Sequence, residues 1–226
     1  MNIELCIALV PEHALSLRLS EVSHSMATLN GAGNTILQLQ GNIGRLAIAP
    51  HMTLYQVRTT VASLDSAACQ VAEVLKMRPA GGAQIGPLHM QAMEISSNDV
   101  EGSTEVKYKT TPEILKLQDM VVKIFNPLRG GMTLERNPAG LTHAEAVAAA
   151  TSGPHLASLE EFGFPEVGPD TFNPHVTVSW RKCEVEMAVG SIPENTGAFS
   201  GAFTQLAIFC MGPQGTTPQR LVAFDL

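Results

Sequence analysis

The chain has 226 residues, and 14 Lys and Arg stand against 21 Asp and Glu, which gives a formal net charge of −7. A chain this acidic does not bind an extended nucleic acid by charge alone, because that requires many cationic side chains on phosphates. An aromatic content of 5% also argues against a broad base-stacking surface. Apolar residues make up 45%, enough for a core, and the length fits one large domain or two small lobes that share an interface.

The first elements alternate between strands and helices. We predict a strand at 2–10, ended by Pro11, and a helix at 12–29 that stops at Asn30-Gly31. The apolar pattern then predicts short strands at 35–40 and 49–58 and a helix at 61–77. Gly81-Gly82 interrupts the chain after this helix.

The second half begins with a predicted hairpin, in which the polar loop 96–103 joins strands at 88–95 and 104–110. A helix starts at Thr111-Pro112, and its expected buried stripe is Ile114, Leu117, Val121 and Ile124. Thr142 and Glu145 have the spacing of a capping box and open an Ala-rich helix. Strands follow at 175–180, 203–211 and 220–224. Because strands and helices do not alternate regularly, we predict an α+β fold with mostly antiparallel sheets.

The chain contains no run of the roughly 18 apolar residues that a membrane span needs. Its apolar start has no basic residue before Arg18, so it is typical of a strand and not of a signal peptide. The cysteines form no CxxC pair and suit the buried thiols of a reducing compartment. They are Cys6, Cys69, Cys183 and Cys210. We therefore expect a cytoplasmic protein.

One short motif occurs twice. Residues 50–56 are PHMTLYQ and residues 174–180 are PHVTVSW, so both read Pro-His-x-Thr-aliphatic. The two histidines lie 175 − 51 = 124 residues apart. From the composition of this chain, such a pattern is expected by chance roughly 0.03 times. The repeat is therefore the strongest functional signal in the sequence.

Strand geometry gives the repeat a meaning, because side chains at i, i+2 and i+4 share one face of a strand. The expected polar stripes are His51, Thr53 and Tyr55 on the first strand, and His175, Thr177 and Ser179 on the second. The aliphatic residues between them would then pack into the core.

Two such stripes can serve one phosphate group. Imidazole gives or takes a proton near neutral pH, so His51 and His175 on opposite sides of a phosphate can act as general base and general acid. Thr53 and Thr177 can donate to non-bridging oxygens as charge develops. This scheme needs no metal or other cofactor, and neither motif holds a carboxylate that would favour a zinc site.

Paired His-x-Thr-aliphatic motifs, one in each half of a chain of this size, resemble the 2H phosphoesterase superfamily. It includes the RNA 2′,3′-cyclic phosphodiesterases, also called 2′-5′ RNA ligase-like proteins. The resemblance implies a bilobal α+β fold, in which two pseudo-twofold-related sheets with outer helices flank a central cleft. It implies metal-independent cleavage of cyclic phosphodiesters or 2′-5′ linkages, with His51 and His175 as the acid/base pair and Thr53 and Thr177 on the phosphate.

The spacing between the motifs is longer than in the compact RNA-end enzymes of this group. The excess falls in Ser96–Ser103 and in Phe125–Phe172. Insertions at these places would cover the cleft and change the substrate.

Five further residues are candidates for substrate binding. Tyr55 borders the expected site and could stack a base. Ser179 occupies the matching position in the second motif and would add a hydroxyl. Lys107 and Lys109 share one face of a predicted strand and could contact phosphate. Arg129 lies in a glycine-flexible loop suited to a phosphate clamp.

We therefore predict a phosphodiesterase acting on a small nucleotide or on the 2′,3′-cyclic phosphate end of an RNA. The partners expected include no extended nucleic acid and no membrane, and the protein is expected to be a monomer. RNA 2′-5′ ligation would be the same chemistry in reverse. A non-catalytic module that binds a nucleotide or phosphate in the same cleft is one alternative, and a metal-binding protein using both histidines is another.

Overall fold

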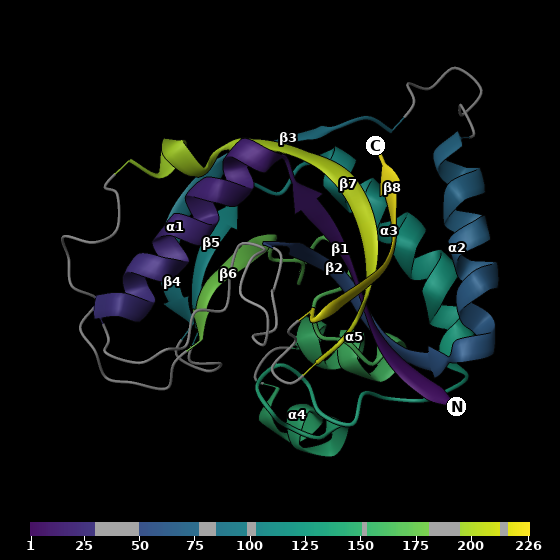
Figure 1. The fold of residues 1–226 in the computed structure, drawn as a ribbon. Helices are drawn as coiled ribbons and strands as arrows, with labels where there is room; N and C mark the ends of the chain where they lie inside the picture. Colours follow the sequence, from purple (N-terminus) through teal and green to yellow (C-terminus); the bar gives the residue numbers. More distant parts are fainter. Residues whose placement is uncertain (30–49, 77–84, 99–102, 151–152, 181–194, 213–216) are drawn as a thin grey trace.

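The computed structural model describes residues 1–29, 50–76, 85–98, 103–150, 153–180, 195–212 and 217–226. The strand predicted at 35–40 lies outside these residues. Figure 1 shows two sheets that meet near the centre of the molecule, with helices outside them. The N- and C-terminal strands both belong to the larger sheet.

The larger sheet has the order β2-β1-β7-β3, and β8 also pairs with β7. Its strands are β1 (Asn2–Pro11), β2 (Met52–Thr60), β3 (Leu88–Met90), β7 (Gly201–Cys210) and β8 (Gln219–Asp225). The smaller sheet has the order β4-β5-β6. Its strands are β4 (Ala92–Asn98), β5 (Ser103–Tyr108) and β6 (His175–Trp180). Every pairing between the described strands is antiparallel, which confirms the predicted α+β class.

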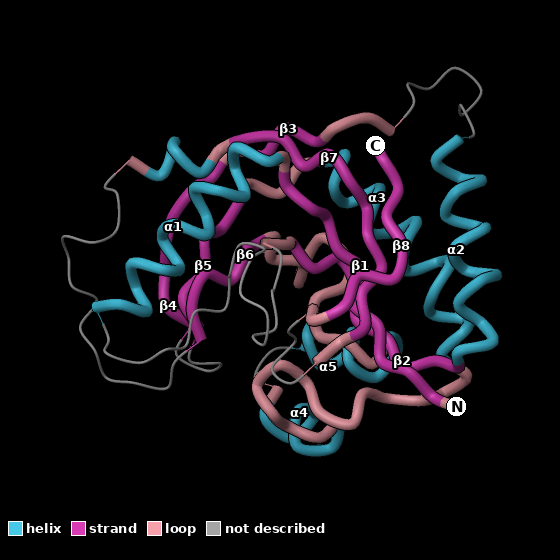
Figure 2. The backbone as a smooth tube through the Cα atoms, in the orientation of Figure 1, coloured by secondary structure: helices cyan, strands magenta, loops and turns pink. Residues whose placement is uncertain are grey.

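The helices lie outside the sheets, as Figure 2 shows. They are α1 (His13–Leu29), α2 (Val61–Lys76), α3 (Pro112–Phe125), α4 (His143–Ala149) and α5 (Gly153–Phe162). Two short 3₁₀ helices, η1 (Asn126–Arg129) and η2 (Thr196–Phe199), complete the described elements. α1 packs against β6, whereas α2 and α3 pack against β2. None of the helices in the described ranges is long and apolar enough to cross a bilayer.

The helix starts follow the predicted capping signals. The Thr111 hydroxyl accepts a hydrogen bond from the Ile114 backbone N–H, and Pro112 occupies the first helical position. Thr142 and Glu145 form the predicted capping box. Each cap satisfies backbone groups that would otherwise be unpaired, and a cap is typically worth about 1 kcal/mol.

Two predicted elements differ from the structure. The strand expected at 88–95 is divided: β3 pairs with β7 in the larger sheet, and β4 pairs with β5 in the smaller one. The chain therefore crosses between sheets at Gln91. The helix opened by Thr142 ends at Ala149, and a separate helix, α5, starts at Gly153-Pro154. Proline lacks a backbone N–H and is tolerated only in the first turn of a helix, so it favours this new start.

The larger sheet has two different faces. Leu5, Ile7 and Leu9 of β1 point into the main apolar core together with residues from the helices. Cys6 and Ala8 point to the other face, where they form a small apolar cluster with side chains of β7. This second face is the one on which the first motif lies.

Candidate active site

The first motif lies at the start of β2 and contains a β-bulge. In the antiparallel pair with β1, Thr53 is opposite Ala8 and Tyr55 is opposite Ile7, so Leu54 has no partner. A bulge of this kind places one extra residue in a strand and breaks the alternation of side chains.

The second motif has its bulge at the equivalent residue. In the pair with β5, Thr177 is opposite Glu105 and Ser179 is opposite Thr104, so Val178 has no partner. The two sets of pairs differ by constant offsets. When 124 is added to the residue numbers of β2 and 97 to those of β1, the pairs between β1 and β2 become the pairs between β5 and β6. Met52, Thr53 and Tyr55 therefore pair in the same register as Val176, Thr177 and Ser179, as a pseudo-twofold repeat requires.

Both motifs alternate between a polar and an apolar face. The histidine and threonine side chains of both motifs are half-buried. The aliphatic residues that separate and follow them are fully buried in the main core: Met52, Leu54, Val176 and Val178. In Figure 1 the two motif strands start near the centre of the molecule and run apart, and β2 contacts β6 directly. The fold thus brings the two motif-bearing strands together.

His51 lies over the small apolar cluster. Its ring centroid is 5.9 Å from that of Phe209. Its Nδ1 is 3.3 Å from the hydroxyl of Thr217, a buried residue just before β8. Because a hydroxyl can donate or accept, this contact is compatible with either tautomer of His51.

His175 has a defined tautomer. Its Nδ1 lies 2.8 Å from the backbone carbonyl of Asn173. A carbonyl only accepts, so Nδ1 carries a proton and Nε2 is the atom that can take up or release one. The Nε2 atom lies 4.0 Å from Oε1 of Glu105.

Thr53 contacts a thiol inside the sheet. Its hydroxyl oxygen lies 3.6 Å from the sulfur of Cys6. Burial raises the pKa of the Cys6 thiol to about 12, although the contact with Thr53 acts in the opposite direction. The thiol therefore stays protonated and can donate weakly to the Thr53 oxygen. That leaves the Thr53 hydroxyl proton available for another acceptor.

Tyr55 does not share the face of His51, contrary to the prediction from strict alternation. The bulge at Leu54 turns Tyr55 to the core side, where it is fully buried. Its hydroxyl donates to the carbonyl of Phe162, 2.8 Å away, and lies 3.0 Å from Oδ1 of Asn126. Burial raises the pKa of Tyr55 well above its usual value. This residue is a core anchor and cannot stack a base at the site.

Gln118 supports the bulge from behind. Its Nε2 donates to the carbonyl of Leu54 at 3.1 Å and to that of Glu166 at 2.7 Å, and its Oε1 accepts from the Gly168 backbone N–H at 3.0 Å. The Leu54 carbonyl belongs to the residue that the strand pairing skips. The amide of Gln118 therefore satisfies a backbone group of the bulge and ties it to the connector before β6.

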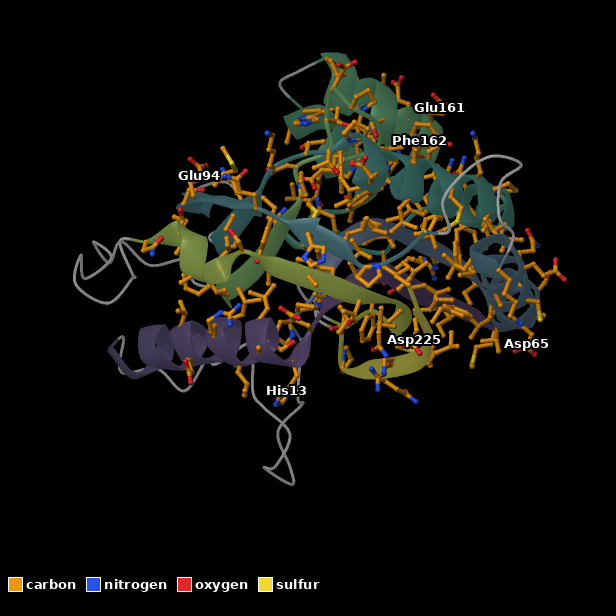
Figure 3. The ribbon with its side chains drawn as sticks, turned by 90° about the horizontal axis from the view of Figure 1, so that it is seen from above. His13, Asp65, Glu94, Glu161, Phe162 and Asp225 are labelled. Carbon is orange, nitrogen blue, oxygen red and sulfur yellow. The ribbon has the colours of Figure 1, made fainter. Side chains whose placement is uncertain are left out.

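Arg129 does not act as a phosphate clamp either. Its guanidinium donates to the carbonyls of Glu161 at 2.8 Å and Met132 at 3.5 Å. Glu161 lies in the last turn of α5, where a cation favourably meets unpaired carbonyls. In Figure 3, Glu161 and Phe162 lie on a different side of the molecule from Glu94 of the smaller sheet. Arg129 thus fastens α5 to η1.

The lysine candidates lie at different places. Lys107 is directly opposite His175 in the β5–β6 pair, and its Nζ lies 3.1 Å from Oε1 of Glu94. Lys109 follows the end of β5 and is exposed. Ser179 lies on β6 opposite Thr104, but its side chain is outside the described part.

The described part of the longer insertion binds the end of β2 that is remote from His51. The Thr59 hydroxyl donates to the carbonyl of Leu128 at 2.7 Å, and Arg58 forms a 2.7 Å ion pair with Glu135. These contacts support the strand from its far end. In the shorter insertion, residues 99–102 lie outside the described part.

Three polar residues at or behind the site were not among the predicted ones. Glu105 precedes Lys107 by two in a predicted strand, so the same alternation that selected Lys107 could have found it. Gln118 falls four residues after Ile114, on the buried stripe of α3, where an amide is unexpected. Thr217 carries no local signal, because it lies outside the predicted strands and 166 residues from His51 along the chain. Among the described residues, no three His, Cys, Asp or Glu side chains form a group that could hold a metal ion.

No protein-family model and no curated protein matches this sequence. Several solved structures, however, have a similar fold. The fold is similar to that of E. coli LigT complexed with phosphate, with a TM-score of 0.51 and 11% identity over 100% of this chain and 98% of that chain. For LigT complexed with 3′-AMP, the TM-score is 0.50 and the identity 10%, over 100% of this chain and 99% of that chain.

A third solved structure, described as a phosphoesterase, is similar to the same degree. Its TM-score is 0.50 and its identity 10%, over 100% of this chain and 99% of that chain. The chain therefore has a LigT-like α+β fold along its whole length. The α+β fold that the two motifs led us to expect is thereby confirmed.

Proposed function

We propose that this protein is a 2H-type phosphoesterase that cleaves a cyclic phosphodiester or a 2′-5′ linkage without a metal ion. The observation that carries the proposal is the identical register of the two motifs, each with its bulge directly after the threonine. Chance repetition of a short sequence would not reproduce the strand pairing around it. The contact between β2 and β6 supports a single site served by both motifs.

The proposed reaction is an in-line displacement. One imidazole takes a proton from water, the water oxygen forms a bond to phosphorus, and the bond from phosphorus to the leaving oxygen breaks. The other imidazole gives its proton to the leaving oxygen. The hydroxyls of Thr53 and Thr177 donate to the non-bridging oxygens and stabilise the added charge. Lys107, beside His175 on the same face, is a further candidate contact for phosphate.

The substrate that we propose is a small nucleotide or the 2′,3′-cyclic phosphate end of an RNA. The net charge of −7 disfavours a long phosphate backbone but leaves room for one phosphate group. LigT, whose fold is similar, has been crystallised with phosphate and with 3′-AMP. We further propose a cytoplasmic monomer, in keeping with the scattered cysteines.

The test is an assay of the purified protein with 2′,3′-cyclic nucleotides and 2′-5′-linked dinucleotides, with and without a chelator. We expect turnover in chelator, and a loss of about 100-fold or more in His51→Ala and in His175→Ala. His13→Ala is the matched control, because His13 is exposed at the start of α1, outside the site. Full activity in both His51→Ala and His175→Ala would show that the site is wrongly assigned.

Other outcomes identify the alternatives. Turnover that requires a metal ion would favour the metal-binding interpretation. Phosphate-ligand binding without turnover, lost in His51→Ala, would favour a binding module. Joining of a 2′,3′-cyclic phosphate end to a 5′-hydroxyl end would establish the ligase direction of the same chemistry.

A further inference from the structure

The pseudo-twofold relation between the motifs is broken at the strand position that lies opposite each threonine. The residue opposite Thr53 is Ala8, and the residue opposite Thr177 is Glu105. Glu105 is 0% exposed. A buried carboxylate is costly unless hydrogen bonds or charges compensate it. The second motif therefore has a carboxylate beside it, whereas the first motif has a small apolar residue at the equivalent strand position.

The Glu105 carboxylate is held in place on its own strand. The Ser103 hydroxyl donates to Oε1 at 2.7 Å. The same Oε1 atom lies 4.0 Å from Nε2 of His175. Since Nδ1 of His175 donates to the carbonyl of Asn173, Nε2 is the ring atom that gains or loses a proton. An acidic group at this distance favours the cationic form of the imidazole.

Other charged groups also lie near β6 within the described part of the chain. Lys107 is opposite His175 on β5, but its ammonium is paired with Glu94 of β4 at 3.1 Å. β2, which contacts β6, brings His51 from the first motif. α1 packs with Val176 and Val178 on the opposite face of β6. Its charged residues, Arg18 and Glu21, thus lie beyond the strand.

Taking the proposed function as its basis, we infer that Glu105 is a positioning residue that keeps His175 protonated in the free enzyme. His175 is then the general acid, which protonates the leaving oxygen, and His51 is the general base, which takes the proton of the attacking water. The symmetric pair of imidazoles thereby acquires fixed and different roles.

The experiment measures the histidines directly by NMR, independently of any turnover. In the unmodified protein we expect His175 to titrate at a higher pH than His51. In Glu105→Gln the midpoint of His175 should fall by about one pH unit or more, with little change for His51. Glu160→Gln is the matched control, since Glu160 is exposed on α5. A midpoint of His175 below that of His51 in the unmodified protein would overturn the inference, even if Glu105→Gln does not fold.

Kinetics provides the second readout. In Glu105→Gln, the alkaline limb of the profile of kcat/KM against pH should move to lower pH. A loss of activity with an unchanged pH profile would mean that Glu105 has a structural role only. Absence of turnover on every diester would refute the proposed function, while the NMR titration would still decide the role of Glu105.

Discussion

The two motif-bearing strands have the same register, but different parts of the molecule support them. Behind β2, polar contacts add to the apolar core: Gln118 binds the carbonyl of the bulged Leu54, and Tyr55 donates to the carbonyl of Phe162. Behind β6, the support that the structure describes is apolar, since Val176 and Val178 share one core cluster with side chains of α1.

The front faces differ as well. β1 presents Cys6 and Ala8 beside the first motif, whereas β5 presents Ser103, Glu105 and Lys107 beside the second. The register of the two threonines is thus the same in both halves, while the packing behind the strands and the charges beside them differ. Backbone pairing sets the positions of these threonines, which leaves the surrounding residues free to assign different roles to the two halves.

The largest effect expected from this comparison concerns the apolar support of β6. Leu19 of α1 is fully buried in the core cluster that contains Val176 and Val178. Leu19→Ala should lower the free energy of unfolding by about 2–5 kcal/mol, because a cavity remains in the packing. Urea denaturation measures this change. Leu17→Ala on the same helix is the control, since Leu17 is only half-buried. Equal losses in the two variants would contradict the packing of α1 against β6.

The second prediction tests whether the motifs contribute equally. Thr53→Val and Thr177→Val each remove one hydroxyl while keeping the branched shape of the side chain. Each should lower kcat/KM by about 100-fold, which corresponds to ~2.7 kcal/mol of transition-state stabilisation. A diester hydrolysis assay provides the measurement. If one variant keeps full activity, only one half of the repeat holds the phosphate, and the functional symmetry fails.

The third prediction concerns the polar support of β2. Gln118→Leu removes the amide that bonds the carbonyls of Leu54 and Glu166 and the N–H of Gly168. Leaving these buried groups unpaired should cost about 1–3 kcal/mol in unfolding free energy. Urea denaturation of Gln118→Leu beside Gln70→Leu, an exposed position on α2, measures it. A variant as stable as Gln70→Leu would show that the bulge needs no such support.

Much of this fold follows from local signals in the sequence. Alternating apolar residues located β1, β6 and β7, and the signals at Thr111-Pro112 and Thr142 located the starts of α3 and α4. The assignment of strands to sheets did not follow. The apolar pattern of 88–95 is continuous, but its two ends pair with different sheets. Pairing depends on residues far away in the chain, which a local pattern does not contain.

The site shows the same division between local and long-range information. Period-two alternation placed the histidine, the threonine and the aliphatic residue of each motif correctly on their faces. It failed at Tyr55, one residue beyond the bulge, because a bulge is visible only in the pairing with β1. Arg129 was misassigned for a related reason. A cation in a glycine-rich loop suits a phosphate, but the guanidinium of Arg129 is already bonded to the carbonyl of Glu161 at the end of α5.

The fourth prediction uses the apolar face beside His51. Burial raises the pKa of Cys6 to about 12, from an ordinary value of 9.0. A raised pKa means that the folded state favours the neutral thiol. The buried thiol contributes fully to stability below the pKa that Cys6 has in the unfolded chain. This contribution is lost as the pH rises toward the pKa that Cys6 has in the folded protein. Between about pH 9 and pH 12, the wild type should therefore lose stability faster than Cys6→Ala does.

Urea midpoints measured at increasing pH provide the test for Cys6. Cys69→Ala is the control, because Cys69 is exposed, and its difference from the wild type should not change in the same manner. Parallel curves for the wild type and Cys6→Ala would show that the thiol beside Thr53 is accessible to water. The apolar environment assigned to the first motif would then be wrong.

The smallest effect is expected at the charged pair beside His175. The hydrogen bond from Lys107, together with its charge, lowers the pKa of Glu94 below its ordinary value. Lys107→Met should therefore raise the pKa of Glu94 in an NMR carboxyl titration. Because Glu94 is exposed, added salt should reduce the difference. Lys123→Met, which breaks the separate pair with Asp119, should leave Glu94 unchanged. If the pKa of Glu94 does not respond to Lys107→Met, Lys107 is unpaired in solution. The second motif would then have a cation available for phosphate, whereas β1 offers no such cation to the first motif.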